Sequence, residues 1–488
     1  MNVKPIHIER RTIALRPDHS RVLLRPFYPG DAKRVGRIVT RILSIPENRV
    51  LPLLNEVLTE FSVRHPKIGD FFLERFGKIH DLLSLDDKLT DARRLLIGSY
   101  FVSEFSLESA ALFNPSIVPH PDQSGVPPGG LRFVLSLRAT GEGHVSSITF
   151  RTGMIHPNGW IEVLAASGFL TEARQISSPL YDRALFERKL FDLRLTNEFT
   201  RRTIDRLGQS FNLKELRRQV REELKQPCEP GGEKERRNTA KAMRALAESN
   251  YEVQFRPEQE LSERIIFPTS PSQRNGIEDA RFVCFQNGDS APVYYATFTA
   301  YDGRVVMPGL METSDFLRFR FITLNGPAAQ NKGMAMFPRK INGLYAMLSR
   351  QDNENLYLVY SDTLHFWYEP KLILAPVFPW EMIQIGNCGS PIETDAGWLV
   401  LSHGVGPMRQ YMIGAFLLDK DDPTKVIGRL REPLLQPAED ERHGYVPNVV
   451  YTCGALVHGS ELIIPYAYAD HSTRFATVPL EEVLSAMS

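Results

Sequence analysis

The sequence has few cysteines, and their spacing suggests neither a metal site nor a disulfide framework. Its 488 residues include four, Cys228, Cys284, Cys388 and Cys453, which lie far apart and form no CxxC pair. Cysteine-rich zinc sites and disulfide-stabilised domains both need more cysteines at closer spacing. We therefore expect four reduced thiols that are mostly buried.

Long apolar runs and a charge imbalance are also missing. Lysine plus arginine and aspartate plus glutamate both number 58, so the formal net charge is zero. No stretch supplies the roughly 18 uninterrupted apolar residues of a membrane span, and the first residues lack the apolar core of a secretory signal. These absences predict a cytoplasmic protein with no nucleic-acid or membrane partner, and they favour a small molecule as the ligand.

Several common catalytic motifs are absent. There is no GxSxG element of a serine hydrolase, and Gly404-Val405-Gly406 is not followed by the helix pattern of a dinucleotide site. His403 and His443 have no histidine or carboxylate partner at helical ligand spacing. We expect no metal and no cofactor, and we interpret these histidines as ligand contacts or core hydrogen-bonding groups.

Two regions show apolar residues at helix spacing, residues 31–113 and residues 179–250. In the first, the last helix is expected to begin near Thr90-Asp91 and to end at Asn114-Pro115. In the second, Asn212 and Glu215 have the spacing of a capping box. The sequence therefore predicts an N-terminal lead-in and helical region over residues 1–113, and a helical insertion over residues 179–250.

The remaining residues, 114–178 and 251–488, are predicted to form short strands separated by turn residues. The clearest strands are residues 131–137, 147–150, 293–298, 344–348, 356–360, 398–401 and 462–466. Many short antiparallel strands are typical of a sandwich, a barrel or a propeller. Polar and aromatic residues recur near strand ends, and this favours a mainly β propeller, whose central funnel collects residues from every blade.

One charged cluster stands out within this β region. Glu278, Asp279 and Arg281 lie between the turn at Asn275-Gly276 and the apolar run that begins at Phe282. Two adjacent carboxylates and an arginine at the mouth of a strand fit either a structural salt bridge between Asp279 and Arg281 or a catalytic carboxylate. The residue types alone leave both interpretations open.

Other polar residues of the β region lie in apolar or glycine-rich settings. They are Asn114, Arg138, Lys332, Arg350, Glu393, His403 and Asp470. Each one alone fits a surface charge or a buried hydrogen-bonding group. Their distribution over successive hairpins is the distribution that a funnel lined from several blades requires.

Taken in order, these segments resemble glycoside hydrolase family 130, the β-mannoside phosphorylases and β-mannosidases built on a five-bladed propeller. The likeness covers residues 114–115, 276–281, 295–303, 337–350, 361–367, 386–406, 417–429 and 466–470. It leaves out residues 31–113 and 179–250, which look like additions to the basic fold. The Glu-Asp-x-Arg element is the most specific part, although family members usually have proline at the position of Ala280.

The resemblance also implies roles for individual residues. Asp279 corresponds to the general acid, whose proton reaches the glycosidic oxygen through a sugar hydroxyl. In a phosphorylase the nucleophile is inorganic phosphate, and Lys332 and Arg350 occupy positions that are basic in the phosphorylases. The residues expected to bind the sugar are Asn114, Arg138, Glu278, Arg281, Lys332, Arg350, His403, Tyr468 and Asp470.

Glu393 departs from the phosphorylase pattern, which has lysine at this position of a Pro-Pro-Ile-Lys-Thr segment. A carboxylate there would repel phosphate, and it would suit the water-activating base of an inverting glycosidase. The same substitution resembles the β-mannosidase members. The sequence therefore favours an inverting β-mannoside hydrolase with Asp279 as acid and Glu393 as base. Glu439 and Glu441 are reserve candidates for the base.

Two alternatives remain open. The first is a β-mannoside phosphorylase that uses inorganic phosphate as co-substrate and releases mannose 1-phosphate, and the second is a carbohydrate-binding propeller without catalysis. For either enzyme we expect a β-mannoside oligosaccharide as substrate, with β-1,2 linkages favoured. The helical additions are expected either to cap the funnel or to form the subunit interface of a homo-oligomer.

Overall fold

The computed structural model describes residues 6–85, 88–177, 180–228 and 232–487. The chain has a mixed, strand-rich fold that separates into two compact units. The larger unit comprises Met1–Pro17, Ala110–Ala166 and Glu172–Ser488, and the smaller one comprises Asp18–Ser109 and Ser167–Thr171. The short strand β8 (Thr171–Glu172) lies where the chain passes from the smaller unit back to the larger one. All site residues expected from the sequence belong to the larger unit.

Among its described residues, the smaller unit contains four helices and one pair of strands. They are β2 (Asp18–Pro26), α1 (Ala32–Leu43), α2 (Glu47–Phe61), α3 (Ile68–Leu83), α4 (Asp91–Ser99) and β3 (Val102–Glu108). Val35, Val39 and Ile42 lie on one buried face of α1, as their spacing predicts. The buried guanidinium of Arg93 donates to the carbonyl of Ile42 at 2.7 Å and so satisfies a carbonyl at the C-terminal end of α1.

The helix predicted to run from residue 90 to residue 113 ends at Ser99, so this part of the sequence prediction is wrong. Val102 begins β3, which pairs antiparallel with β2 along its length. At Gly98 the helix approaches α3 so closely that a Cβ atom would lie 1.9 Å from the carbonyl oxygen of Phe72. Pairing with β2 outweighs the helix spacing of Leu107, and Asn114 lies inside a strand.

Counted over the described residues, the longest sheet has twelve strands, one of which is β8. Its main path runs through β4 (Ala111–Pro119), β5 (Leu131–Thr140), β6 (Ser146–Ile155), β14 (Gly276–Phe285), β15 (Val293–Tyr301), β16 (Val306–Thr313), β17 (Arg318–Thr323), β12 (Tyr251–Gln254) and β9 (Arg174–Ser177), while β7 (Ile161–Val163) and β13 (Arg264–Ile266) pair with β6. The step from β6 to β14 consists of one parallel pair, Ser146 with Gly276. Antiparallel groups therefore meet at this point.

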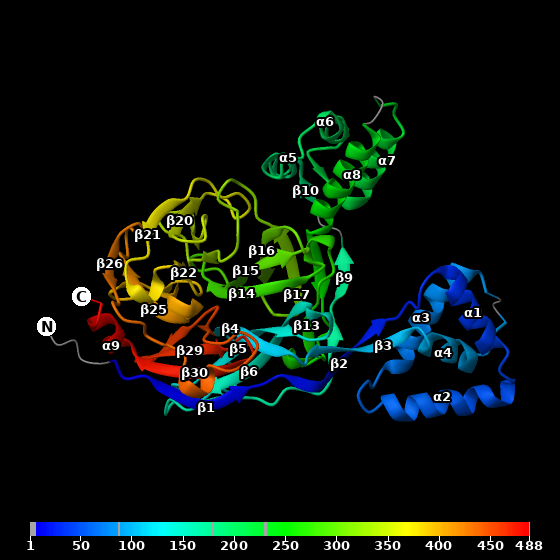
Figure 1. Cartoon of the computed structure of the whole chain (residues 1–488), viewed down its shortest axis with the longest axis horizontal. Helices are drawn as coiled ribbons and strands as arrows, with labels where there is room; N and C mark the ends of the chain where they lie inside the picture. The colour runs from blue at the N-terminus through cyan, green and yellow to red at the C-terminus, as the bar shows by residue number, and fades with distance from the viewer. Residues whose placement is uncertain (1–5, 86–87, 178–179, 229–231, 488) are drawn as a thin grey trace. The chain divides into compact units, whose positions relative to one another are not determined.

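The other sheets of the larger unit follow in chain order. One contains β18 (Ala335–Met336), β19 (Tyr345–Ser349), β20 (Leu356–Ser361) and β21 (Lys371–Leu374). The next contains β22 (Gln384–Asn387), β23 (Ile392–Thr394), β24 (Gly397–Val405), β25 (Tyr411–Leu418) and β26 (Val426–Arg429). The last contains β27 (Val450–Tyr451), β28 (Leu456–His458), β29 (Glu461–Tyr468), β30 (Ser472–Pro479) and β1 (Glu9–Leu15). In the last sheet β1 lies along β30, with Glu9 opposite Thr477 (Figure 1). The short helix α9 (Leu480–Ser485) follows β30.

The seven clearest strands predicted from the sequence are confirmed as parts of β5, β6, β15, β19, β20, β24 and β29, although β19 begins one residue later, at Tyr345. The helices predicted between residues 179 and 250 are present as α5 (Arg183–Asp192), α6 (Glu198–Asp205), α7 (Leu213–Leu224) and α8 (Glu233–Glu248), with the strand pair β10 (Tyr181–Asp182) and β11 (Ser210–Phe211). The predicted capping box is present at the start of α7. Asn212 Oδ1 accepts from the Glu215 N–H at 3.0 Å, and Glu215 Oε2 accepts from the Asn212 N–H at 2.9 Å.

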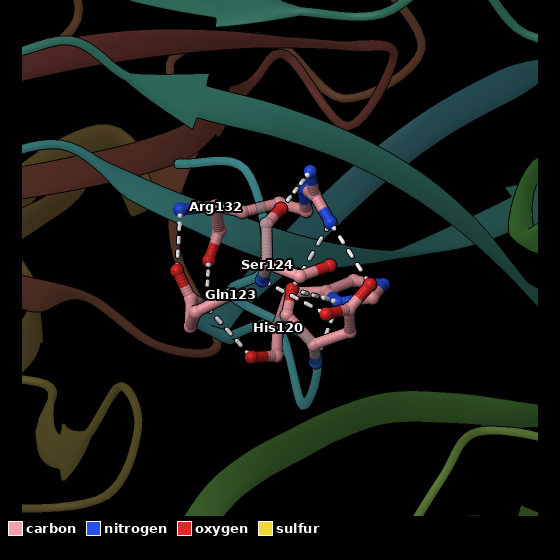
Figure 2. Close-up of polar contacts among 5 residues, drawn as sticks. His120, Gln123, Ser124 and Arg132 are labelled. Carbon is pink, nitrogen blue, oxygen red and sulfur yellow. Dashed lines mark hydrogen bonds and ion pairs between the residues drawn. The ribbon is translucent and has the colours of Figure 1, made fainter. Parts of the chain in front are cut away.

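Polar contacts around Arg132 fix the connection between β4 and β5 (Figure 2). Its guanidinium donates to Asp122 Oδ2 at 3.1 Å and to the Ser124 carbonyl at 2.9 Å. The Gln123 side chain donates to the carbonyl of His120 at 2.7 Å and accepts from the Arg132 N–H at 3.0 Å. The loop is thus tied to its own strand ends, and this sets the register of a hairpin that carries two of the expected site residues.

Two β-bulges face each other within the longest sheet. The register of β4 shifts at Asn114, and the register of β14 shifts at Asp279. The hydroxyl of Ser116 accepts from the backbone N–H of Phe282 at 3.0 Å and joins the two strands just beyond the bulges. A bulge turns a side chain away from the regular alternation, and here it directs two polar side chains toward one point.

We expect Ser116→Ala to destabilise the larger unit by about 1–3 kcal/mol, because it leaves the buried Phe282 N–H without an acceptor. Chemical denaturation measures the free energy of unfolding. Ser147→Ala is the matched control, since the Ser147 hydroxyl is a donor 3.5 Å from the Ala139 carbonyl and its loss strands no buried N–H. Equal destabilisation by the two substitutions would contradict the bridging role of Ser116.

Candidate active site

Asp279 is the centre of a group of buried polar side chains. Its Oδ1 accepts from Asn114 Nδ2 at 2.7 Å and from Arg138 Nη1 at 3.2 Å. Its Oδ2 accepts no hydrogen bond from the described residues, and the side chain keeps a small exposed area. One oxygen is therefore held in place, and the other is open to a ligand.

Arg138 connects the two adjacent carboxylates of the cluster. Its Nη2 donates to Glu278 Oε1 at 2.8 Å, and its Nε donates to Ser146 Oγ at 2.8 Å. Lys332 Nζ lies 3.9 Å from Glu278 Oε2 on the other side. The structure thus brings together Asn114, Arg138, Glu278, Asp279 and Lys332, all named from the sequence.

Arg281 holds the backbone of the bulge and not the Asp279 carboxylate. Its Nη1 donates to the Asp279 carbonyl oxygen at 2.9 Å, its Nε to the Cys388 carbonyl at 2.8 Å, and its Nη2 to the Tyr451 hydroxyl at 2.7 Å. Side-chain pairing of Asp279 with Arg281, one of the two interpretations left open, is therefore replaced by pairing with Arg138. Tyr451 was not named from the sequence.

Three residues of the site have a left-handed backbone conformation. Asn114 has a φ of 49°, Asp279 of 52° and Asp470 of 48°. Asparagine and aspartate tolerate this region better than other non-glycine residues do. Asn114 and Asp279 lie at register shifts within their strands, and Asp470 lies in the turn between β29 and β30. Strained positions of this kind concentrate at functional sites.

The pKa values of Asp279 and Asp470 are shifted in opposite directions. Burial acts to raise the pKa of Asp279, but the charges of Arg138, Arg281 and Lys332 outweigh it and lower this pKa to about 2. Burial, reinforced by the negative charge of Asp279, raises the pKa of Asp470 to about 6. Two carboxyl groups with separated pKa values are a common arrangement for acid and base chemistry.

Arg350 is a buried cation with an uncharged partner. It is 6% exposed, and its Nη1 lies 3.0 Å from His403 Nε2. Burial, and next the charge of Arg350, hold the pKa of His403 well below its usual value, so the ring is neutral and Nε2 accepts. Within the described part of the chain, Arg350 has no carboxylate partner and its Nε has no hydrogen bond. A buried guanidinium without a counter-ion is costly and is suited to binding an anion.

Strand β22 and the residues just after it contain buried polar atoms without a hydrogen-bond partner among the described residues. Asn387 is fully buried, and neither atom of its amide has a hydrogen bond among the described residues; the same holds for Ser390 Oγ. Asn387 pairs with Ser402 in the ladder between β22 and β24, one residue before His403. The sequence reasoning missed Asn387, although a polar residue between Gly386 and Cys388 carries the same signal that singled out His403.

The structure does not bring Glu393 to this cluster. Its carboxylate forms two hydrogen bonds with Arg339, at 2.7 and 2.8 Å, and lies 3.6 Å from Lys420 Nζ. The hydrogen bond from Arg339 is the largest effect that lowers the pKa of Glu393. Glu393 lies opposite Trp398 on β24, five residues from His403 and hence about 17 Å along the strand. The structure therefore does not support Glu393 as the base.

Tyr468 and the reserve bases have structural surroundings. Glu441 is buried and accepts from the Tyr466 hydroxyl at 2.5 Å and from Arg474 at 3.2 Å. Glu439 is exposed in the same short turn. Tyr468 packs in the hydrophobic core under the guanidinium of Arg474, 4.7 Å from its ring. None of them contacts the Asp279 carboxylate.

Two further observations concern residues 6–85, 88–177, 180–228 and 232–487. Among them, no group of three histidine, cysteine, aspartate or glutamate side chains is placed to hold a metal ion. No helix formed by these residues is long and apolar enough to cross a membrane.

The chain is similar in sequence to several characterised phosphorylases. It is 33% identical to 1,2-beta-oligomannan phosphorylase of Thermoanaerobacter sp. (strain X514) over 231 residues, 46% of this chain and 75% of that protein. It is 34% identical to beta-1,2-mannobiose phosphorylase of Listeria innocua over 227 residues, 45% of this chain and 62% of that protein. It is 34% identical to beta-1,4-mannooligosaccharide phosphorylase of Ruminococcus albus over 188 residues, 36% of this chain and 56% of that protein.

A solved structure of beta-1,2-mannobiose phosphorylase from Listeria innocua with beta-1,2-mannobiose gives a TM-score of 0.47 at 22% sequence identity, covering 78% of this chain and 93% of that chain. The family model of glycoside hydrolase family 130, described as beta-1,4-mannooligosaccharide phosphorylase, matches residues 234–488, slightly more than half of the sequence. The matched residues include Asp279, Arg281, Lys332, Arg350, His403 and Asp470. The chain belongs to glycoside hydrolase family 130.

Proposed function

We propose that this protein is a β-mannoside phosphorylase that cleaves β-1,2-linked mannooligosaccharides with inorganic phosphate and releases mannose 1-phosphate. The observation that carries the proposal is Arg350, a buried guanidinium whose nearest polar partner is the neutral His403. An anionic co-substrate supplies the missing counter-charge. The hydrolase interpretation depended on Glu393, whose carboxylate pairs with Arg339 and lies away from the cluster.

The names of the relatives support the same choice. The matched proteins from Thermoanaerobacter and Listeria innocua are phosphorylases of β-1,2-linked mannosides, at 33% and 34% identity. Since each match covers less than half of this chain, substrate and linkage remain part of the proposal. Product analysis distinguishes this function from that of a hydrolase and from that of a sugar-binding protein without catalysis.

The proposed reaction is a single inverting displacement. A phosphate oxygen bonds to C1 of the terminal mannose on the face opposite the glycosidic oxygen, and the bond from C1 to that oxygen breaks. The leaving oxygen takes up a proton, for which Asp279 is the source, through a sugar hydroxyl as the family resemblance implies. The products are mannose 1-phosphate of inverted configuration and a mannoside shortened by one sugar.

Asp279 must be protonated to act as an acid, whereas its surrounding cations lower its pKa to about 2. Phosphate bound near Lys332 and Arg350 would oppose the field of these cations, and a nearby like charge raises the pKa of a carboxyl group. We infer that phosphate binding raises the pKa of Asp279 and so prepares the acid. The nucleophile and the acid are then coupled through the same positive charges.

We also infer that the larger unit is a five-bladed propeller. Its antiparallel groups in chain order are β4 to β6, β14 to β17, β18 to β21, β22 to β26, and β27 to β30 with β1. Each group, or the turn at its edge, supplies at least one polar residue of the proposed site: Asn114, Asp279, Arg350, His403 and Asp470, in that order. A funnel lined from every blade accounts for this distribution.

Product analysis tests the proposed function. With β-1,2-mannobiose we expect mannose and mannose 1-phosphate only when inorganic phosphate is present, and Asp279→Asn is expected to lower kcat by a factor of about 10²–10⁴, the usual contribution of a general acid. Chromatography of the products with and without phosphate measures both. Release of mannose alone at an equal rate without phosphate would establish a hydrolase instead, and binding without any turnover would establish a sugar-binding protein.

A pair of variants distinguishes the proposed phosphate ligand Arg350 from the expected base Glu393. Arg350→Met removes a charge-assisted contact worth about 1.5–3 kcal/mol, so we expect the KM for phosphate to rise by about 10–100-fold. Glu393→Gln breaks an ion pair whose carboxylate is 35% exposed, and we expect kcat and both KM values to stay within about twofold. Initial rates at varied phosphate measure both variants. A large loss of kcat in the Glu393 variant alone would restore that residue as a base.

Asp470 gives a prediction with a defined pH window. Its pKa is raised by burial, and next by Asp279, to about 6. Ionisation of Asp470 in the folded protein therefore lowers the free energy of unfolding, by an amount that grows as pH rises from about 4 to about 6 and stays constant at higher pH. We expect Asp470→Asn to raise the free energy of unfolding by about 1–3 kcal/mol at pH 7.5, with a smaller gain at pH 4.5. The same variant should lose turnover, because a sugar-binding acceptor is removed. Denaturation at the two pH values checks the sign, which a stability gain confined to pH 4.5 would contradict.

A further inference from the structure

The helical insertion is fixed to the end of strand β17 by two side chains of α5. Lys189, 4% exposed, donates from Nζ to the carbonyl oxygen of Leu324 at 2.6 Å. Asp192 Oδ2 accepts from the backbone N–H of Gly326 at 2.9 Å. Residues three apart on a helix lie on the same face. One face of α5 therefore binds both the Leu324 carbonyl and the Gly326 N–H.

The C-terminal end of the insertion contacts the same part of the chain, at the end of β17. Asn250, which follows α8, accepts on Oδ1 from the backbone N–H of Thr323 at 2.9 Å. Thr323 is the last residue of β17, immediately before Leu324. Gly326 has a φ of 100°, and a Cβ atom there would lie 2.1 Å from the carbonyl oxygen of Trp367, so the chain turns within a tight space. Both ends of the insertion therefore anchor residues 323–326.

These anchored residues begin the segment that delivers Lys332 to the site. Lys332 follows Gly326 by six residues, its side chain is 44% exposed, and it forms no hydrogen bond with the described residues beyond its 3.9 Å approach to Glu278. Its position therefore depends on the backbone that carries it. The next residue, Gly333, packs against Arg350, where a Cβ atom would lie 2.8 Å from Nε. One segment thus starts at the insertion and ends between the two cations assigned to phosphate.

Attaching a helix through a buried lysine costs free energy, because the ammonium group must be desolvated. Burial lowers the pKa of Lys189 to about 8, although the charge of Asp192 opposes this shift. An apolar side chain would dock α5 without the cost of desolvating an ammonium group. What the lysine adds is a directed hydrogen bond that fixes one carbonyl group, and that carbonyl begins the segment leading to Lys332.

We propose that Lys189 and Asp192 are positioning residues, which fix the start of residues 324–334 and thereby set Lys332 for phosphate. The proposal rests on the proposed phosphorylase function. It assigns the helical insertion a role in phosphate affinity, exerted through the chain and without contact with either substrate.

The test uses the full chain and varies phosphate at saturating β-1,2-mannobiose. Lys189→Met and Asp192→Ala should each raise the KM for phosphate about tenfold, the effect of one lost charge-assisted hydrogen bond, with kcat changed less than about twofold. Arg217→Met is the matched control, because Arg217 is an exposed cation of the same insertion that pairs with Glu248 at 2.8 Å and does not contact residues 323–326. Its KM for phosphate should stay unchanged.

Chemical rescue provides a readout that a general loss of stability would not give. The Lys189 side chain lines a pocket of about 270 Å³ together with Asn325 and His365. In Lys189→Ala, propylammonium entering from this pocket should replace the missing atoms and lower the raised KM for phosphate. Tetramethylammonium, which has no N–H to donate to the Leu324 carbonyl, should not restore it.

The outcomes separate the two proposals. If the unaltered protein shows no phosphate-dependent cleavage, the proposed function fails. If it is a phosphorylase and both α5 variants keep the KM for phosphate of the unaltered protein, only the positioning role is overturned. Equal changes in the KM values for both substrates, with a lowered Tm and no rescue by propylammonium, would also overturn it, since they indicate a purely structural helix contact.

Discussion

The hydrogen bond from Arg281 to the backbone carbonyl of Asp279 is the interaction on which the site depends. Asp279 adopts a left-handed conformation, which costs an L-residue about 1–2 kcal/mol, and it does so at a β-bulge. Arg281 holds this carbonyl at 2.9 Å while its other nitrogens donate to the carbonyl of Cys388, just after β22, and to the hydroxyl of Tyr451 in β27. Strands distant in sequence therefore share one guanidinium. One carboxylate oxygen of Asp279 then accepts a hydrogen bond from Asn114, and the other oxygen is left free.

The distribution of charge follows from this arrangement. Arg138 pairs with both Glu278 and Asp279, and Lys332 lies 3.9 Å from Glu278 on the other side. Arg350, by contrast, is paired with a neutral ring. For the phosphate of the proposed function, the desolvation of Arg350 has already occurred during folding, before the anion arrives.

Local patterns in the sequence were sufficient for the parts of the fold that local forces determine. The strand at residues 293–298 follows from a short apolar run between turn residues, and the capping box of Asn212 and Glu215 follows from their spacing. The contact of Asn114 with Asp279 joins residues 165 positions apart, and no local pattern encodes it. Glu393 illustrates the same limit. The sequence shows its place in a motif but not its pairing with Arg339, which lies 54 positions away. Strand β3 was misassigned because its partner β2 lies about 80 residues earlier in the chain.

The pairing of β1 with β30 has a consequence for synthesis of the protein. Residues 9–15 find their partner only after residues 472–479 have been made. At translation rates of about 5–20 residues per second, the first strand waits on the order of half a minute to a minute and a half with its edge unpaired. An unpaired strand edge is a template for association with other chains. The seven residues of β1 therefore need protection from such association while the chain is still growing on the ribosome.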